Sequence, residues 1–143
     1  YACLSGSGFY NRAEGFRYVY ALANAGGTDS ATLYDSAGND TLMGKPEYTF
    51  MYGANFHNCA EGFQFVRAHA TAGGTDRAYL NDSAGDDRLN AADDLAQLIY
   101  GDGRSVSVYD FTWVQAVSSR GGTDTKQVET IDFVLQTPGS WID

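Results

Sequence analysis

The stretch that decides the fold is AGGTDSATLYDSAGND at residues 25–40, because a near copy, AGGTDRAYLNDSAGDD, occupies residues 72–87. The tetrapeptide GGTD begins a third time at residue 121. Self-similarity at a period of 20–50 residues is typical of solenoids, propellers and other arrays. The chain therefore divides into three units, 1–47, 48–95 and 96–143, which we expect to form a single repeat domain.

Aligning the three units shows which positions the architecture keeps apolar. One position is always Phe (Phe16, Phe63 and Phe111), and small or branched apolar residues alternate with variable polar ones after it. A period of two is the pattern of a half-buried strand. We expect an all-β fold with four short strands in each unit, in the first near 2–5, 16–23, 30–34 and 40–43. The only candidate for a helix is the short stretch 90–100.

Two architectures suit three units of this length. In a parallel β-solenoid of the β-helix or β-roll kind the units stack along an axis, whereas in a β-trefoil three four-stranded units close around a three-fold axis. The sequence favours the solenoid, because the acidic phrase reads as two successive nonapeptides with Leu33 and Leu42 in the same place. The β-trefoil remains the alternative.

Two resemblances support a repeat array. The Gly38-x-Asp40-x-Leu42 segment partly resembles the nonapeptides of calcium-binding β-rolls of the RTX type. The segments LSGSGFYNRAEGFRYVYA, AGGTD, LYDSAGNDT and KPEYTF resemble the tandem repeat of about 47 residues in large secreted and cell-surface proteins of planctomycete-type bacteria. That resemblance implies an open array of units.

The two ends of the chain differ. In the third unit VETIDFVLQTP replaces the acidic turn, and solenoids need an atypical end unit that covers the last coil. We therefore interpret 125–143 as a C-terminal cap. The first unit has the pattern of an internal unit, which would leave strand edges bare. We expect either upstream repeats of the same polypeptide or another copy, stacked head to tail into a filament, to cover that end.

Composition restricts the partners. The formal net charge is −9, so nucleic acid and anionic membranes are poor partners. The sequence has no apolar run of 18 residues, and we expect no membrane insertion. Abundant Asp and Gly with scarce Lys favour an extracellular or cell-surface location. The expected function is that of a non-enzymatic structural repeat module in a secreted surface or matrix protein, and the alternative is a carbohydrate-binding, lectin-like module.

Calcium is the candidate cofactor, since it binds carboxylate and carbonyl oxygens near glycine turns. The simpler interpretation, which the sequence favours, is that Asp and Asn beside Ala-Gly close tight turns through side-chain to backbone hydrogen bonds. The residues that would serve either role are Asp29, Asp35, Asn39 and Asp40 in the first unit and Asp76, Asp82, Asp86 and Asp87 in the second.

Other site types have weaker signals. His57 and His69 lie outside the repeated frame, and no serine has a nucleophile context, so we expect no catalytic residues. Cys3 and Cys59 could form one disulfide or remain two thiols. Tyrosines at variable, outward positions could stack on glycans or make lateral contacts between molecules, and these are Tyr10, Tyr20, Tyr34, Tyr52 and Tyr79.

Overall fold

A computed structural model of the chain describes residues 2–6 and 9–143, with side chains from residue 10 onward. All regular structure in this part is β-strand, so the all-β prediction is confirmed. The strands are β1 (Ala2–Gly6), β2 (Phe9–Ala13), β3 (Tyr18–Leu22), β4 (Ser30–Tyr34), β5 (Thr41–Gly44), β6 (Tyr48–Gly53), β7 (Phe56–Glu61), β8 (Phe65–His69), β9 (Arg77–Asn81), β10 (Arg88–Asp93), β11 (Leu95–Ile99), β12 (Ser105–Tyr109), β13 (Trp113–Val117), β14 (Thr125–Ile131) and β15 (Val134–Gln136).

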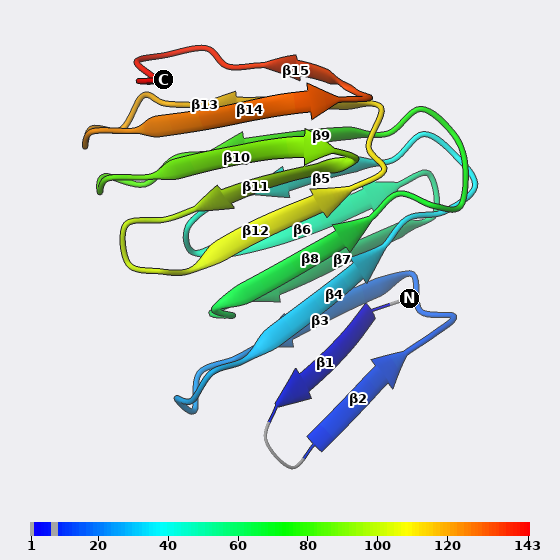
Figure 1. Ribbon diagram of the computed structural model, residues 1–143. Helices are drawn as coiled ribbons and strands as arrows, with labels where there is room; N and C mark the ends of the chain where they lie inside the picture. Colours follow the sequence, from blue (N-terminus) through cyan, green and yellow to red (C-terminus); the bar gives the residue numbers. More distant parts are fainter. Residues whose placement is uncertain (1, 7–8) are drawn as a thin grey trace.

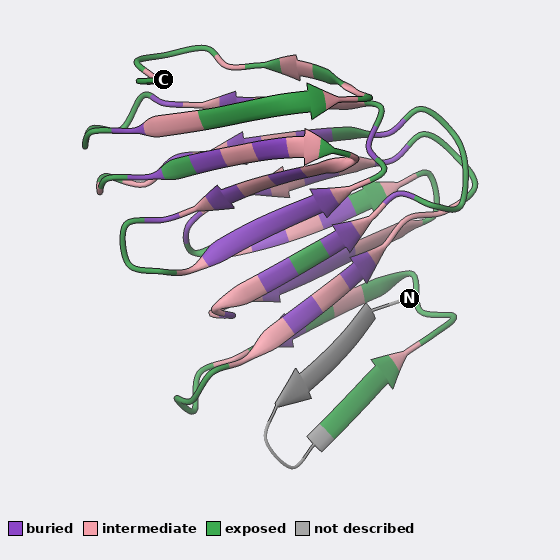
Figure 2. Cartoon of the chain, viewed as in Figure 1, coloured by how far each residue is buried: buried purple, intermediate pink, exposed green. Residues whose placement is uncertain are grey.

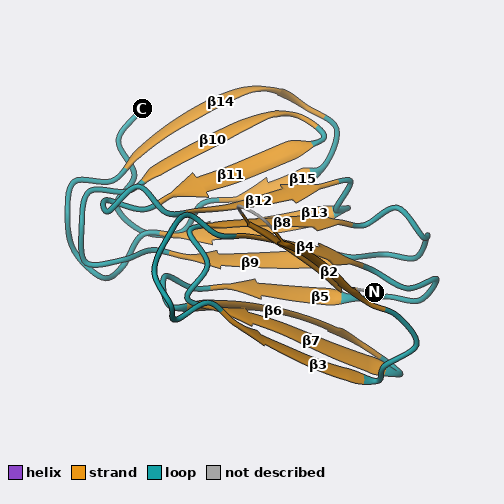
Figure 3. Cartoon of the chain, turned by 90° about the horizontal axis from the view of Figure 1, so that it is seen from below, coloured by secondary structure: helices purple, strands orange, loops and turns teal. Residues whose placement is uncertain are grey.

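The strands form two sheets that face each other (Figure 1). The order in the first sheet is β14-β10-β11-β12-β8-β4-β1-β2, and in the second it is β15-β13-β9-β5-β6-β7-β3. The chain passes back and forth between the sheets while it advances along them, which is the β-solenoid predicted from the repeat. Figure 3, turned by 90°, shows strands and loops only.

Each unit contributes a hairpin followed by three single strands in alternate sheets. In the second unit β6 and β7 lie together in one sheet, and β8, β9 and β10 then alternate. Because three crossings is an odd number, the next hairpin, β11–β12, falls in the opposite sheet. Single strands of neighbouring units pair in parallel, as in β4 with β8, and the hairpins add antiparallel pairs to the ladder.

The core lies between the sheets and consists mainly of Ala, Val and Leu, with Phe63, Tyr100 and Phe111 as its aromatic members (Figure 2). Ala31 and Leu33 of β4 are buried, and so are Ala78 and Leu80 of β9, which confirms the period-two pattern read from the repeat. Alanine beside leucine suits this space because it lets two sheets approach closely and still pack to high density.

The C-terminal end of the core is closed by the last unit. Here β14 and β15 form the edge of one sheet each. Four large apolar side chains from 131–141 pack against the buried core, namely Ile131, Phe133, Leu135 and Trp141. The indole N–H of Trp141 donates to the carbonyl of Ala116 at 3.2 Å, which fixes the final segment across β13. The predicted C-terminal cap is therefore confirmed.

Two expectations about local structure are wrong. The stretch 90–100 is not a helix but the end of β10, a turn and β11. Asp93 adopts a left-handed backbone (φ 52°) at that turn, and Ala91, Ala96 and Leu98 alternate inward on either side. Each unit also has a fifth strand, the second of its hairpin (β2, β7 and β12), in addition to the four that we expected.

Candidate functional site

The acidic turns lie at the borders between units, where they hold one unit to the next. At the first border the carboxylate of Asp35 accepts a hydrogen bond from the backbone N–H of Ala72 at 2.8 Å. Asn39 Oδ1 accepts from the N–H of Thr75 at 2.8 Å. The N–H of Asp40 donates to Asp76 Oδ1 at 2.7 Å. The turn of the first unit therefore binds the GGTD loop of the second.

The second border repeats this arrangement with the equivalent residues. Asp82 accepts from the N–H of Arg120 at 2.5 Å, and Asp86 Oδ1 accepts from the N–H of Thr123 at 2.8 Å. The N–H of Asp87 donates to the carboxylate of Asp124 at 2.9 Å. All three contacts occur at both borders of the molecule. They are therefore a feature of the repeat and not of one border alone.

A serine closes each turn from within. The N–H of Ser36 donates to Asp40 Oδ2 at 2.5 Å and its hydroxyl donates to the same oxygen at 2.9 Å. The N–H and the hydroxyl of Ser83 likewise donate to the carboxylate of Asp87, to Oδ2 and Oδ1 respectively. Local side-chain to backbone bonds of this kind stabilise tight turns. These serines were not among the predicted site residues, although both copies of DSAG contain one.

Glycine is required where the loop meets the turn. A Cβ at Gly74 would lie 2.1 Å from the carbonyl oxygen of Gly38, and one at Gly122 would lie 2.0 Å from that of Gly85. Both glycines have positive φ (112° and 82°), which L side chains rarely adopt. The second glycine of GGTD thus permits the backbones of two units to touch.

The first border also gathers three carboxylates. Oxygens of Asp35, Asp40 and Asp76 lie within 4.8 Å of one another, and the latter two residues are buried. Burial is the main cause that raises the pKa of Asp35 and of Asp76 above the usual value, and the neighbouring carboxylates raise both further. These three of the predicted calcium ligands come together. Asp29 does not join this cluster, and Asp82, Asp86 and Asp87 form no cluster of their own.

The raised pKa values predict how stability depends on pH. A carboxyl whose pKa is higher in the folded state stabilises the fold while it is protonated, and this contribution is lost as the pH rises through the folded pKa. We expect the melting temperature to fall as the pH rises above the ordinary aspartate pKa of about 4. Asp76→Asn, which keeps an oxygen for the N–H of Asp40, should flatten this fall.

Calcium would relieve the same repulsion between carboxylates. If the cluster binds it, calcium raises the melting temperature of the parent chain at pH 7 and raises that of Asp76→Asn less. Melting with calcium and with EGTA measures both effects. Equal midpoints for the parent chain in the two conditions would reject the metal role and leave the hydrogen-bonded turn as the function of these aspartates.

The predicted tyrosines lie on the outer faces, in separate groups. Tyr34 stacks on His69 with ring centroids 5.3 Å apart, and Tyr79 packs edge-on against Trp113 at 5.1 Å. Tyr52 stacks on His57 at 6.4 Å. The more exposed pair are Tyr10 and Tyr20. The hydroxyl of Tyr20 donates to the carboxylate of Glu61, and this bond raises the pKa of the tyrosine to about 12.

The two histidines are explained by these stacks. His69 lies between Tyr34 and Tyr109, whose ring centroid is 4.7 Å away. Burial lowers the pKa of His69, so its neutral form is favoured in this position. His57 stacks on Phe50 at 5.3 Å. Both side chains therefore belong to aromatic ladders on the sheet surfaces.

The cysteines differ in what the structure describes. Cys59 is buried on β7, and burial raises the pKa of its thiol. Cys3 is part of β1, in the other sheet, but its side chain lies outside the described residues. The disulfide between them stays a prediction.

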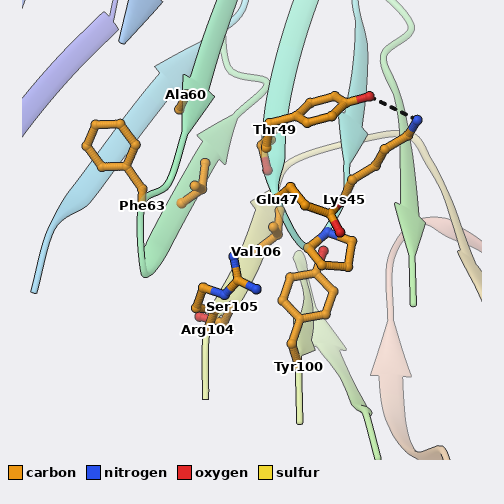
Figure 4. Close-up of a pocket in the computed structure, with 12 residues that line it drawn as sticks. Lys45, Glu47, Thr49, Ala60, Phe63, Tyr100, Arg104, Ser105 and Val106 are labelled. Carbon is orange, nitrogen blue, oxygen red and sulfur yellow. Dashed lines mark hydrogen bonds between the residues drawn. The ribbon is translucent and has the colours of Figure 1, made fainter. Parts of the chain in front are cut away.

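A small cavity lies between the sheets beneath the turn that joins β5 to β6 (Figure 4). It has a volume of about 10 Å³ and is lined in part by Lys45, Tyr100 and Arg104. Such a volume holds about one water molecule and is too small for a substrate. Tyr100 is almost fully buried here, and burial raises the pKa of its hydroxyl above the usual value.

No helix in the described part of the chain is long and apolar enough to cross a membrane. Comparison with protein-family models, with curated protein sequences and with solved structures found no match to the chain.

Proposed function

We propose that the protein is a non-enzymatic structural module of a secreted cell-surface or extracellular-matrix protein, in which it ends a stack of β-units. The observation that carries this proposal is the hydrogen-bonded contact between acidic turn and GGTD loop, which recurs with equivalent partners at both unit borders. A contact that the chain makes twice is a means of joining units. It is unlike a catalytic group, which needs a single arrangement around one substrate.

The two ends of the stack favour different roles. At the C-terminal end Lys126 occupies the inward position that Ala31 and Ala78 hold in the other units, and its ammonium group pairs with Asp143 at 3.2 Å. An inward-pointing charge on an edge strand opposes the addition of another strand. We therefore propose that stacking extends from the N-terminal end, onto further units of the same repeat, and that the C-terminal end closes the array.

Head-to-tail filaments of identical chains are the competing arrangement. On our proposal the isolated chain stays monomeric, because its capped end offers nothing complementary to the open end and the net charge of −9 opposes association. Sedimentation velocity at increasing concentration, with negative-stain microscopy of the same samples, measures this. Filaments, or a mass that grows with concentration, would contradict the capped-end proposal and support head-to-tail assembly.

Carbohydrate binding is the second candidate, and the aromatic ladders on the outer faces favour it. Flat aromatic rings stack on the apolar faces of sugars, and Phe50, Tyr52 and His57 form one continuous group on the second sheet. Pelleting the monomer with insoluble polysaccharide separates this candidate from a purely structural role. Retention that is lost on Tyr52→Ala would support it.

A further inference from the structure

The GGTD loop of the first unit has no acidic turn against it. At the two borders the second glycine of this motif touches a backbone carbonyl, as described above for Gly74 and Gly122. Their equivalent, Gly27, has the same kind of backbone (φ 104°), yet no atom of the described residues lies within 4 Å of the place that a Cβ would take there. The loop therefore has the conformation that receives a turn, with open space where the turn would lie.

The polar groups that bind a turn are also present and free. The N–H groups of Ala72 and Thr75 and the carboxylate of Asp76 make the three contacts at the first border. Their equivalents in the first unit are the N–H groups of Ala25 and Thr28 and the carboxylate of Asp29. Within the residues that the structure describes, none of these three groups has a hydrogen-bond partner.

The same loop borders a concave and partly apolar surface. A pocket of about 270 Å³ opens there, lined by Asn11, Leu22, Ala23, Asn24, Ala25, Gly26, Asp29 and Phe63. Close by in the sequence, Phe16 is 67% exposed, although its equivalents Phe63 and Phe111 are only 6% and 3% exposed. The side chain that belongs to the core of every other unit is thus uncovered in the first.

The order of the strands also indicates that a preceding unit would pair with the first unit. The first strand of the second and third units, β6 and β11, pairs with the last strand of the preceding unit, β5 and β10. These last strands also pair with β9 and β14 on their other side. In the first unit β1 instead pairs directly with β4, the equivalent of β9 and β14. One strand place between β1 and β4 is therefore absent.

We propose that the loop 25–29 is a docking socket for an acidic turn, D-S-A-G-[ND]-D, supplied by a preceding unit of the same repeat. The carboxylate of the turn's first residue accepts from Ala25, its fifth residue accepts from Thr28, and the N–H of its last Asp donates to Asp29. The last strand of the docking unit takes the place between β1 and β4. This inference rests on the proposed function and specifies the contact through which stacking occurs.

A second copy of this chain cannot supply the turn. At the positions of Asp35, Asn39 and Asp40 its third unit has Thr130, Val134 and Leu135. The turns of the first and second units are already engaged at the internal borders. The occupant is therefore a repeat unit with an intact acidic turn, and copies of this chain should not dock on one another through this socket.

The experiment adds such a unit to the full chain. Residues 1–47 are placed before residue 1, which gives a Glu-Tyr junction like the natural one at Glu47 and Tyr48. We expect the melting temperature to rise by at least about 5 °C, because stability in repeat proteins grows with nearest-neighbour interfaces. Hydrogen exchange followed by NMR should show newly protected amides at Ala25 and Thr28 of the original unit.

The matched control carries Asp35→Ala and Asn39→Ala in the added unit only. It should lose the protection of the Ala25 and Thr28 amides and part of the gain in melting temperature, while the strands of the added unit remain protected. Equal protection of both amides in the two extended chains would overturn the docking socket but leave stacking intact. An added unit that is unprotected throughout, with the melting temperature of the original chain, would overturn the proposed stacking function as well.

Discussion

Gly74→Ala should destabilise the protein far more than Gly27→Ala, although the two glycines occupy equivalent positions with similar backbones (φ 112° and 104°). Both changes force a side chain into a left-handed conformation, which costs about 1–3 kcal/mol. Only at Gly74 does the new Cβ also meet a carbonyl oxygen, that of Gly38, at 2.1 Å. Relieving that overlap must separate two hydrogen-bonded backbones, and overpacking of this kind costs a further ~1–3 kcal/mol.

Urea unfolding followed by circular dichroism gives the two free energies of unfolding. Gly122→Ala is the internal check, since its Cβ would lie 2.0 Å from the carbonyl oxygen of Gly85 at the other border. We expect Gly74→Ala and Gly122→Ala to lose similar amounts of stability, and Gly27→Ala to lose only the about 1–3 kcal/mol of backbone strain. If all three variants lost the same stability, backbone strain alone would explain them, and the contact between turn and loop would contribute little.

The sequence predicted the core well, because its signal is repeated and local. Alternation of Ala and Leu at Ala31 and Leu33, and again at Ala78 and Leu80, defines the inward face of a strand without any knowledge of its partners. The loss of the acidic turn in the third unit predicted the cap for a similar reason. Large apolar residues there replace a polar turn, and an end of a solenoid is where such residues are needed.

The hairpins were harder to predict. The second hairpin strand of the first unit, β2, follows glycine and serine residues and contains Asn11 and Arg12, so its composition resembles a loop. In 90–100, two alternating segments meet at Asp93 and Asp94, and the join shifts the phase so that no single strand pattern spans it. The turn is recognised by the left-handed backbone of Asp93, and the sequence alone does not predict that backbone angle.

The candidate site shows a different limit of sequence reasoning. The sequence GGTD is identical at 26–29 and at 73–76. An acidic turn packs against the second copy but not against the first, within the described residues. Identical letters cannot reveal which copy has a neighbour, because the neighbour comes from another part of the fold. The sequence also left a turn and a metal site as alternatives for the aspartates. The structure adds which oxygens are already engaged by backbone N–H groups.

Asp87→Ala should have the largest effect among the acidic residues. Asp87 is 1% exposed, and its carboxylate accepts from the N–H of Ser83 at 2.5 Å and from the N–H of Gly101 at 2.9 Å. Removing the carboxylate leaves two backbone donors without an acceptor, one in the turn (Ser83) and one in the loop between β11 and β12 (Gly101), at about 1–3 kcal/mol each. We therefore expect a loss of about 2–6 kcal/mol in the free energy of unfolding, measured by urea titration.

Asp86→Ala is the matched control, since it changes the same residue type one position earlier in the same turn. Asp86 is exposed and makes one bond, to the N–H of Thr123, which water can replace when the side chain is removed. Its loss should stay near about 1 kcal/mol. Both variants shed one negative charge, so a change in overall repulsion cancels in the comparison. Equal losses would mean that charge, and not the buried hydrogen bonds of Asp87, governs the stability of the turn. A larger loss for Asp87→Ala would mean that these hydrogen bonds, to Ser83 and Gly101, stabilise the unit border.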